Sequence, residues 1–227
     1  MNFDEYRSLE QHYYPVILLL DVSASMKGEP IRALHEAVGV MVDAFAKEIT
    51  RERMITVAIM TFGADGAVVH THYTDASELQ KQGVPALKAG GGTLLYEALT
   101  LAKDMIEDKS KTPGRWYEPS VVLVSDGHPA SGWEKALNSF VQTGRTARCL
   151  RIGVPIGAKA DEDMMLRFTG DKAMIFHAQD ASKISDAFRN VVLSVTKSFD
   201  KAQAVSSQPT VKRDTLQPTL KRGVQTT

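Results

Sequence analysis

The sequence contains little cysteine, no long apolar segment and no excess of either charge. Cys149 is its only cysteine, so no disulfide can form within the chain, and we expect a reducing compartment. No stretch reaches the roughly 18 consecutive apolar residues that indicate a membrane-spanning helix. Residues 1–11 also lack the apolar segment of a secretory signal. We therefore expect a cytoplasmic protein that has no membrane partner.

Positive and negative charges balance along the 227 residues, with 27 Lys and Arg against 27 Asp and Glu. A chain without net charge has no overall field that attracts nucleic acid, so nucleic acid is not an expected partner. The length suits one domain with a single core and a short appendage. A hydrophobic share of 43% and a charged share of 24% are ordinary for a soluble globular protein.

A strand followed by an acid and two hydroxyls organises the chain. Residues 16–20 are apolar and mostly branched, which indicates a strand buried on both faces. Asp21, Ser23 and Ser25 come next, where this strand must leave the sheet. Because ligands of open α/β sheets bind beyond the carboxyl ends of the strands, these side chains lie where a site is expected. Their oxygens are hard ligands, which suit Mg²⁺ better than zinc or copper.

Two later segments can complete this site. Thr93 follows the glycine run 90–92 and precedes an apolar helical pattern, so we expect Thr93 at the N-cap or in the first turn of a helix. Residues 120–125 form a second buried strand, and Asp126 follows it. We therefore predict a Mg²⁺ site, with Mn²⁺ or Ca²⁺ as alternatives. The expected ligands are Asp21, Ser23, Ser25, Thr93 and Asp126, and the expected partner-binding rim is Lys27, Gly92 and His128.

The same residues resemble the metal-ion-dependent adhesion site of the von Willebrand factor A (VWA) family. That site combines an Asp-x-Ser-x-Ser loop, here residues 21–25, with a threonine after a glycine-rich turn and an aspartate in a Ser/Thr-Asp-Gly turn. The three parts occur in the family order, and the resemblance covers residues 12–200. It implies a non-catalytic module whose bound Mg²⁺ accepts an Asp or Glu carboxylate from a partner protein.

Two longer segments are similar to the stand-alone bacterial VWA proteins of tellurium-resistance (Ter-type) and stress gene clusters. These segments are residues 18–31 and 121–129. The sequence departs from the common pattern at Ala24, and at Ala130 just after the second segment, but neither change removes a metal ligand. The similarity implies a scaffold or regulator of a bacterial stress response. It also implies a Ser/Thr kinase and a PP2C-type phosphatase as candidate partners.

Strand and helix patterns alternate along the chain. This order predicts a Rossmann-like, doubly wound, mostly parallel sheet with helices on both faces. We expect six strands, of which residues 67–73 alternate apolar and polar side chains and so form an antiparallel edge strand. Runs 147–154 and 173–176 are the last two expected strands. The predicted organisation is an N-terminal extension over 1–11, the VWA domain over 12–200 and a flexible tail over 201–227.

The expected tail contains the internal repeat of the sequence. It is rich in Gln, Ser, Thr, Pro, Lys and Arg, a composition typical of disorder. The unit QPTVKR at residues 208–213 recurs nine residues later as QPTLKR. We predict that Thr210 and Thr219 are phosphorylated, or docked by a partner, because an extended threonine after proline is accessible to a kinase. Chance similarity, a solubilising tail and an extended segment paired with the edge strand are the alternatives.

An enzyme of haloacid-dehalogenase type is the main alternative function. Such enzymes also place an aspartate after the first strand of a Rossmann-like sheet and bind Mg²⁺. Their pattern needs a second acid two residues later, where this sequence has Ser23. No motif places a His, Lys or Cys beside Asp21 as an acid-base partner, so we expect no catalysis. Nucleotide binding by the glycines at 90–92 is a third alternative, but they do not follow the first strand as that fingerprint requires.

Overall fold

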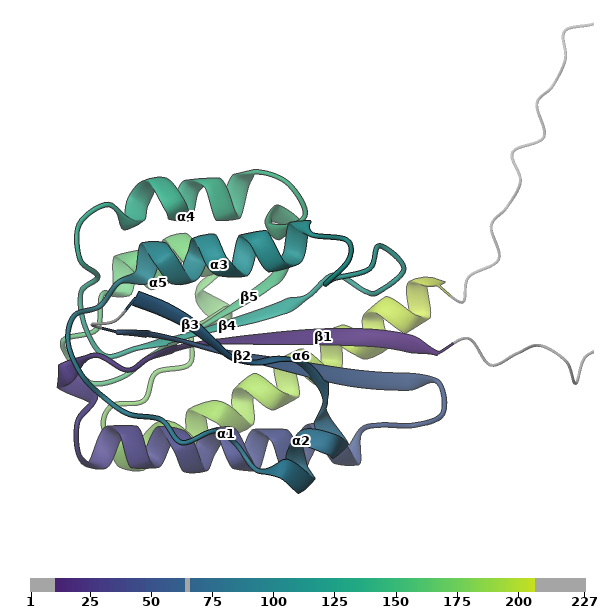
Figure 1. The fold of residues 1–227 in the computed structure, drawn as a ribbon, viewed down its shortest axis with the longest axis horizontal. Helices are drawn as coiled ribbons and strands as arrows, with labels where there is room; N and C mark the ends of the chain where they lie inside the picture. Colours follow the sequence, from purple (N-terminus) through teal and green to yellow (C-terminus); the bar gives the residue numbers. More distant parts are fainter. Residues whose placement is uncertain (1–10, 64–65, 207–227) are drawn as a thin grey trace, which may run out of the picture.

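The computed structural model describes residues 11–63 and 66–206, which form a sheet between two layers of helices (Figure 1). The strand order is β3-β2-β1-β4-β5. The strands are β1 (His12–Asp21), β2 (Arg53–Gly63), β3 (Gly66–Asp75), β4 (Ser120–Ser125) and β5 (Leu150–Pro155). The helices are α1 (Glu29–Lys47), α2 (Ala76–Gln82), α3 (Leu95–Glu107), α4 (Trp133–Gln142), α5 (Glu162–Thr169) and α6 (Ile184–Ser206). This is the α/β architecture that the sequence predicts.

β1 lies at the centre of the sheet. It pairs in parallel with β2 on one side and with β4 on the other, and β5 extends the parallel set beyond β4. β3 pairs antiparallel with β2 at the edge, which confirms the edge strand predicted from residues 67–73. Because the other four strands run in the same direction, their carboxyl ends meet at one edge of the sheet.

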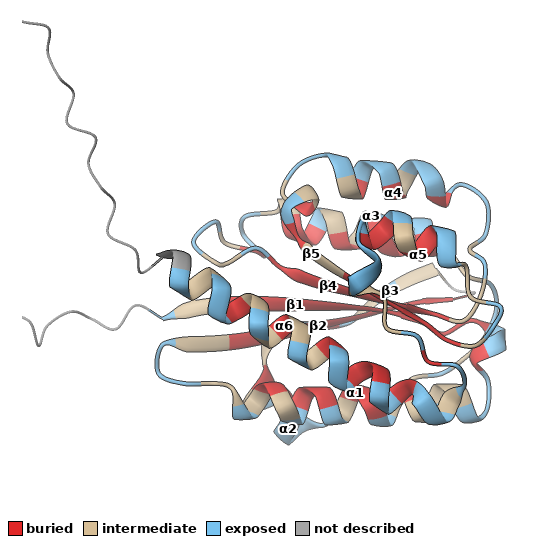
Figure 2. Cartoon of the chain, turned by 180° about the vertical axis from the view of Figure 1, so that it is seen from behind, coloured by how far each residue is buried: buried red, intermediate tan, exposed pale blue. Residues whose placement is uncertain are grey.

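Alternate side chains of β1 enter two separate cores, which explains why this strand is apolar throughout. Val16, Leu18 and Leu20 face the core that α1, α2 and α6 cover. Ile17 and Leu19 face the core that α3, α4 and α5 cover. All five side chains are fully buried, and Figure 2 shows the buried strands running between the two helix layers. Burial of one such side chain contributes roughly 1.5–3 kcal/mol, so β1 is a main source of stability.

The helices turn apolar stripes toward these two cores. In α6 the apolar side chains at helical spacing form one buried stripe, and its members are Ile184, Phe188, Val191, Val195 and Phe199. Pro30 lies in the first turn of α1, where its missing N–H leaves no hydrogen bond unmade. None of the described helices has the length and apolarity needed to cross a membrane.

The described sheet has five strands, so the prediction of a sixth strand at 173–176 is wrong. This segment begins in the 3₁₀ helix Lys172–Met174. Beyond that turn Ile175 makes only an isolated parallel bridge to Gly153 of β5, and the next bridge joins Ala178 to Ile156, just after β5. The tight turn leaves too few consecutive extended residues for a continuous ladder.

Two element bounds also differ from those predicted. The strand expected over 147–154 begins later, at Leu150, because Thr146–Arg148 form a 3₁₀ helix. At the other end, α6 extends to Ser206, so the helix includes the first residues of the predicted tail. The change in composition after residue 200 therefore does not stop the helix.

Candidate metal centre

Asp21 ends β1 and is fully buried. Its Oδ1 accepts a hydrogen bond from the backbone N–H of Ser23 (2.8 Å). Its Oδ2 accepts one from the hydroxyl of Ser125 (2.6 Å). Parallel pairing places Leu20 opposite Val124, so the next residues along the two strands, Asp21 and Ser125, are neighbours. Both carboxylate oxygens are therefore held in fixed directions.

Hydroxyl contacts link the loop after β1 to the loop after β4. The hydroxyl oxygens of Ser23 and Ser25 lie 3.0 Å apart, and the Ser25 hydroxyl donates to Oδ1 of Asp126 (2.8 Å). The two serines are close because Ser23 is the N-cap of a short 3₁₀ helix, Ala24–Met26. Four of the five predicted ligands, Asp21, Ser23, Ser25 and Asp126, thus form one connected polar cluster.

The glycine loop lies directly against the loop after β1. Gly90 donates its N–H to the carbonyl of Val22 (2.7 Å), and Ala24 donates its N–H to the carbonyl of Gly91 (2.9 Å). Gly91 has a φ of +68°, a conformation that glycine adopts without the steric penalty of a side chain. This turn explains why glycine stands at position 91, two residues before the fifth predicted ligand.

That fifth ligand, Thr93, is placed next to the cluster by its backbone. Its carbonyl accepts a hydrogen bond from the N–H of Ala130 (2.9 Å), four residues after Asp126. Its hydroxyl makes no hydrogen bond with the residues that the structure describes. The prediction that Thr93 caps α3 or lies in its first turn is wrong. The first turn of α3 closes on the Leu94 carbonyl instead, which leaves Leu94 as the N-cap.

The cluster contains two carboxylates, and no described basic side chain forms an ion pair with either. Burial raises the pKa of the Asp21 carboxyl, hydrogen bonds from Ser125 and Ser23 lower it, and the nearby charge of Asp126 raises it again. Neither Asp21 nor Asp126 takes part in any ion pair within the described part of the chain. Two close carboxylates without a cation favour a positively charged ligand.

The donor set fits a hard divalent cation. It consists of two carboxylates and three hydroxyls, with no sulfur or imidazole, which suits Mg²⁺ or Mn²⁺. Over residues 11–63 and 66–206 no group of three or more His, Cys, Asp or Glu is placed to hold a metal.

The three predicted rim residues lie on the three loops that meet at this cluster. Lys27, Gly92 and His128 are all exposed. The His128 Nδ1 lies 3.7 Å from Oδ2 of Asp161, the N-cap residue of α5. The rim therefore includes an acid as well as a lysine and a histidine.

The sequence prediction missed two residues of this region. Ser125 is the more important of the two. Its side chain is buried, and its hydroxyl donates the hydrogen bond that holds the Asp21 carboxylate. Its signal was a polar residue ending an apolar strand directly before Asp126. Asp161 had no local signal, since its contact with His128 depends on how α5 packs against the sheet. Thr210 and Thr219, the predicted phosphorylation or docking sites, lie outside the described residues.

Residues 16–128 match the family model of the von Willebrand factor type A domain. This segment contains all five predicted ligands and the rim residues. No curated protein sequence matches the chain significantly.

Several solved structures share this fold. Proximal thread matrix protein 1 from the mussel byssus, with zinc in its MIDAS motif, is 15% identical with a TM-score of 0.66, and the match covers 82% of this chain and 48% of that one. A von Willebrand factor type A protein from Catenulispora acidiphila is 19% identical with a TM-score of 0.60, and the match covers 82% and 43%. Manganese-loaded TRAP from Plasmodium vivax is 17% identical with a TM-score of 0.56, and the match covers 79% and 72%. The chain thus spans about half the length of the mussel protein.

Proposed function

Because the chain carries a von Willebrand factor type A domain, we propose that it is a non-catalytic, metal-dependent protein-binding module. Mg²⁺, with Mn²⁺ or Ca²⁺ as alternatives, is held by Asp21, Ser23, Ser25, Thr93 and Asp126. A carboxylate from an Asp or Glu of a partner protein completes the site. The observation that supports this most directly is the polar cluster that joins Asp21 to Asp126, whose two carboxylates make no ion pair with any described basic side chain.

The chemistry of the cluster explains why a partner carboxylate is expected. Mg²⁺ takes near-octahedral oxygen coordination and keeps water where the protein supplies too few ligands. The five proposed ligands fill five of the six positions around the cation, so one position stays open to water, and a partner carboxylate can replace that water. Lys27, Gly92 and His128 surround the cluster and would contact the residues beside that carboxylate.

Two solved relatives support a divalent cation but leave its identity open. The mussel structure has zinc in its MIDAS motif, and the Plasmodium structure is manganese-loaded. Both proteins are less than 25% identical to this chain, so the metal remains a proposal here. We favour Mg²⁺ because every proposed ligand is a hard oxygen.

We further propose a cytoplasmic role as a scaffold or regulator in a bacterial stress response of the Ter type. A Ser/Thr kinase and a PP2C-type phosphatase are the first partners to test. The support for this is the sequence similarity of segments 18–31 and 121–129 to that branch of the family. Co-purification of either enzyme in the presence of Mg²⁺, and its loss with a chelator, would support the assignment. Binding that persists in the presence of the chelator would contradict this assignment.

The alternative of a haloacid-dehalogenase-type phosphohydrolase has less support. Ser23 stands where that chemistry needs a second acid, and it is buried beside Asp21. The hydrogen-bond partners of the Asp21 carboxylate are Ser23 and Ser125, neither of which is an acid-base group near neutral pH. We expect no Mg²⁺-dependent phosphatase activity, and turnover that Asp21→Asn abolishes would overturn the non-catalytic assignment.

Calorimetric titration with Mg²⁺ and thermal unfolding test the metal centre. A ligand at a hundred times its dissociation constant adds about 2.7 kcal/mol to the free energy of unfolding by mass action. Asp126→Ala should remove both the binding heat and this stabilisation. Asp104→Asn, an exposed acid on α3, should keep both and so controls for nonspecific charge effects. A wild-type protein that neither binds nor is stabilised by Mg²⁺ would show that the proposal is wrong.

A further inference from the structure

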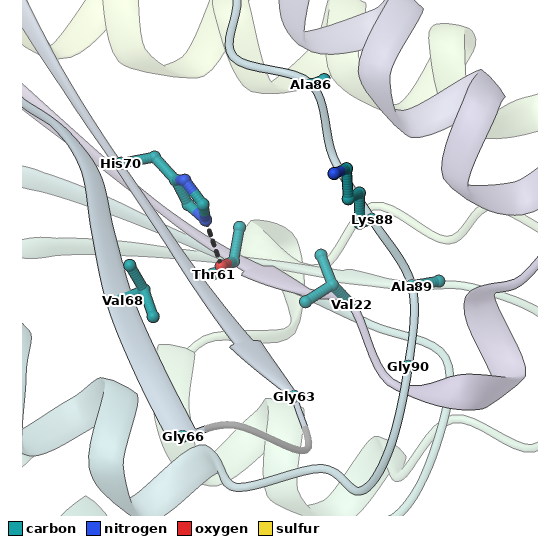
Figure 3. A pocket seen from close by; sticks show the side chains of 10 residues that line it. All are labelled: Val22, Thr61, Gly63, Gly66, Val68, His70, Ala86, Lys88, Ala89 and Gly90. Atoms are coloured by element: carbon teal, nitrogen blue, oxygen red, sulfur yellow. Dashed lines mark hydrogen bonds between the residues drawn. The ribbon is translucent and has the colours of Figure 1, made fainter.

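A pocket of about 550 Å³ lies beside the loops of the candidate metal centre (Figure 3). One wall is formed by β2 and β3, on the side of the sheet that faces α1. The other wall is formed by residues 86 and 88–90 of the connection between α2 and α3. Its volume falls within the range of roughly 300–1,000 Å³ that is typical of ligand sites.

The pocket exists because helix cover is thin at this corner of the sheet. α2 ends at Gln82, and the connection that follows crosses the corner without forming a helix. Thr61, Val68 and His70 point into the space beneath it (Figure 3), and Val68 is 43% exposed. The Thr61 hydroxyl and Nε2 of His70 are hydrogen-bonded at 2.8 Å, which holds the imidazole in place.

Two residues that line the pocket belong to the loops that build the metal centre. Val22 lines the pocket and directly follows Asp21, while Gly90 lines it and precedes the Gly91 carbonyl that accepts from Ala24. The Gly90 N–H donates to the Val22 carbonyl (2.7 Å), so the two loops meet between the metal centre and the pocket. A peptide held at the metal centre therefore has its neighbouring residues next to the pocket.

The polar groups of the pocket favour an anion. Lys88 and His70 stand on opposite walls and face each other across the space (Figure 3). None of the described residues that line the pocket is acidic, and Lys88 makes no ion pair within the described part of the chain. An ammonium group can donate several hydrogen bonds to a carboxylate, and charged hydrogen bonds of this kind are the stronger ones.

We propose that this pocket binds a second acidic side chain of the partner whose first carboxylate reaches the metal. The carboxylate of this second residue accepts hydrogen bonds from Lys88, and its methylene groups contact Val22 and Val68. This inference rests on the proposed function and deepens it, because it gives the partner a motif of two acids at a fixed spacing. Selectivity then comes from the pocket, and metal dependence comes from the cluster beside it.

A displayed peptide library with one fixed Asp and random flanks provides the probe. It is selected on the full chain, once with Mg²⁺ and once with a chelator. Selection on the wild type should enrich peptides that carry a second Asp or Glu at one fixed spacing, on one side of the fixed Asp. This enrichment should occur only with Mg²⁺. Lys88→Glu should lose this preference and enrich Lys or Arg at that position. Lys81→Glu, an exposed charge reversal on α2, should select the same peptides as the wild type.

Synthetic peptides then measure the contribution of the second acid. The selected peptide should bind Lys88→Glu about tenfold more weakly than it binds the wild type, because like charges would meet in the pocket. The same peptide with Gln in place of the second acid should bind the wild type and Lys88→Gln with equal affinity. Calorimetric titration of each variant with Mg²⁺ reports separately on the metal centre.

The failure of the two proposals can be told apart. If no peptide is enriched in a Mg²⁺-dependent way, the carboxylate-capture function fails, and the pocket inference fails with it. If enriched peptides need Mg²⁺ and the fixed Asp but show no second acid, only the pocket inference is overturned. The same holds if the preference for a second acid persists in Lys88→Glu.

Discussion

Asp21 combines two features that are unfavourable for a carboxylate in a protein without bound metal. It is buried, and the charge of Asp126 lies nearby. Desolvation and repulsion between like charges both oppose ionisation. A divalent cation reverses both effects, because it attracts the two carboxylates at once. The same residue is therefore destabilising without metal and stabilising with it.

This contrast gives a prediction for Asp21→Asn. The variant should melt at a higher temperature than the wild type in a chelator and should gain nothing from Mg²⁺. Asparagine keeps an acceptor for the Ser23 N–H and offers an amide to Ser125, while the buried charge is removed. A gain of about 1 kcal/mol corresponds to roughly 2–4 °C for a domain of this size. Scanning calorimetry measures both effects, and a variant that melts below the wild type in chelator contradicts this account of Asp21.

Ser125 acts as a positioning residue, since it touches Asp21 and is itself buried. Ser125→Ala should weaken Mg²⁺ binding about 10- to 100-fold, the range known for groups that orient metal ligands. The physical reason is that Oδ2 of Asp21 loses the donor that fixes its direction. Ser120→Ala removes a similarly buried hydroxyl at the start of the same strand and should leave the Mg²⁺ affinity unchanged. Equal losses in the two variants would indicate general destabilisation rather than positioning.

Cys149 should be unreactive in the folded protein. It is 6% exposed, and burial raises the pKa of its thiol to about 12. The reactive thiolate is therefore scarce near pH 8. Labelling with a thiol-specific chromogenic reagent should be slow in the native protein and rapid after unfolding in guanidinium. Rapid labelling of the native protein would show that the segment around Cys149, between the 3₁₀ helix and β5, opens readily.

At the scale of elements, three segments are in close contact at Gly63, the last residue of β2. A β carbon there would lie 3.0 Å from the Gly90 carbonyl oxygen and 3.1 Å from the Val22 side chain. Gly63→Ala should therefore push the glycine loop away from the end of β1. We expect the free energy of unfolding to fall by roughly 1–3 kcal/mol, and Mg²⁺ affinity to fall with it. Urea unfolding and Mg²⁺ titration measure the two effects.

Gly39→Ala is the matched control for that change. A β carbon at Gly39, inside α1, would meet nothing within 4 Å. Alanine is the better helix former, so this variant should gain up to about 1 kcal/mol in stability. Mg²⁺ affinity should stay the same. If both glycine substitutions weaken Mg²⁺ binding alike, the close approach at Gly63 is not the cause.

The strand ends were the most predictable part of the fold and of the site. An uninterrupted apolar run followed by an acid is a local signal, and it located β1, β4, Asp21 and Asp126 without any long-range information. Parallel pairing then follows from the alternation of strands and helices. The closeness of Ser25 to Asp126 is a consequence of that pairing. Metal binding by these residues stays a prediction until it is measured.

Other features could not be predicted because they depend on contacts between distant segments. Thr93 follows the glycine run as an N-cap residue would, yet its carbonyl is held by Ala130 on another loop, and α3 begins two residues later. The segment at 173–176 has the composition of a strand, but the 3₁₀ turn before it leaves only isolated bridges to β5. In both places tertiary contacts override the local preference.

At the scale of the whole molecule, the repeat in the tail gives a prediction that the structure does not address. Phosphorylation of Thr210 and Thr219 should add about −1.5 to −2 charge beside each Lys-Arg pair. Phosphopeptide mass spectrometry of protein from native cells should find both sites modified. Thr226, outside the repeat units, should stay unmodified. Two units in one tail can also bind one partner at the same time, because binding of the first unit gives the second a high effective concentration near that partner.

Removal of residues 207–227 tests the same hypothesis through binding. If the tail carries a docking motif, the truncated protein should lose a partner that the full chain retains. A double Thr210→Ala, Thr219→Ala variant should lose the same partner if phosphorylation is required. Unchanged partners together with unmodified threonines would leave a solubilising role as the better account.

The position of β1 at the centre of the sheet has a consequence for when the metal centre can form. Ser25 and Asp126 are 101 residues apart in the chain, and Asp21 and Ser125 are 104 apart. Contacts of such long range form late, because closing a long loop costs entropy that only the completed sheet offsets. A growing polypeptide that has not yet produced β4 carries only part of the ligand set. The cation therefore cannot act as a template for early folding, and partner capture is restricted to chains in which β4 has been made and has paired with β1.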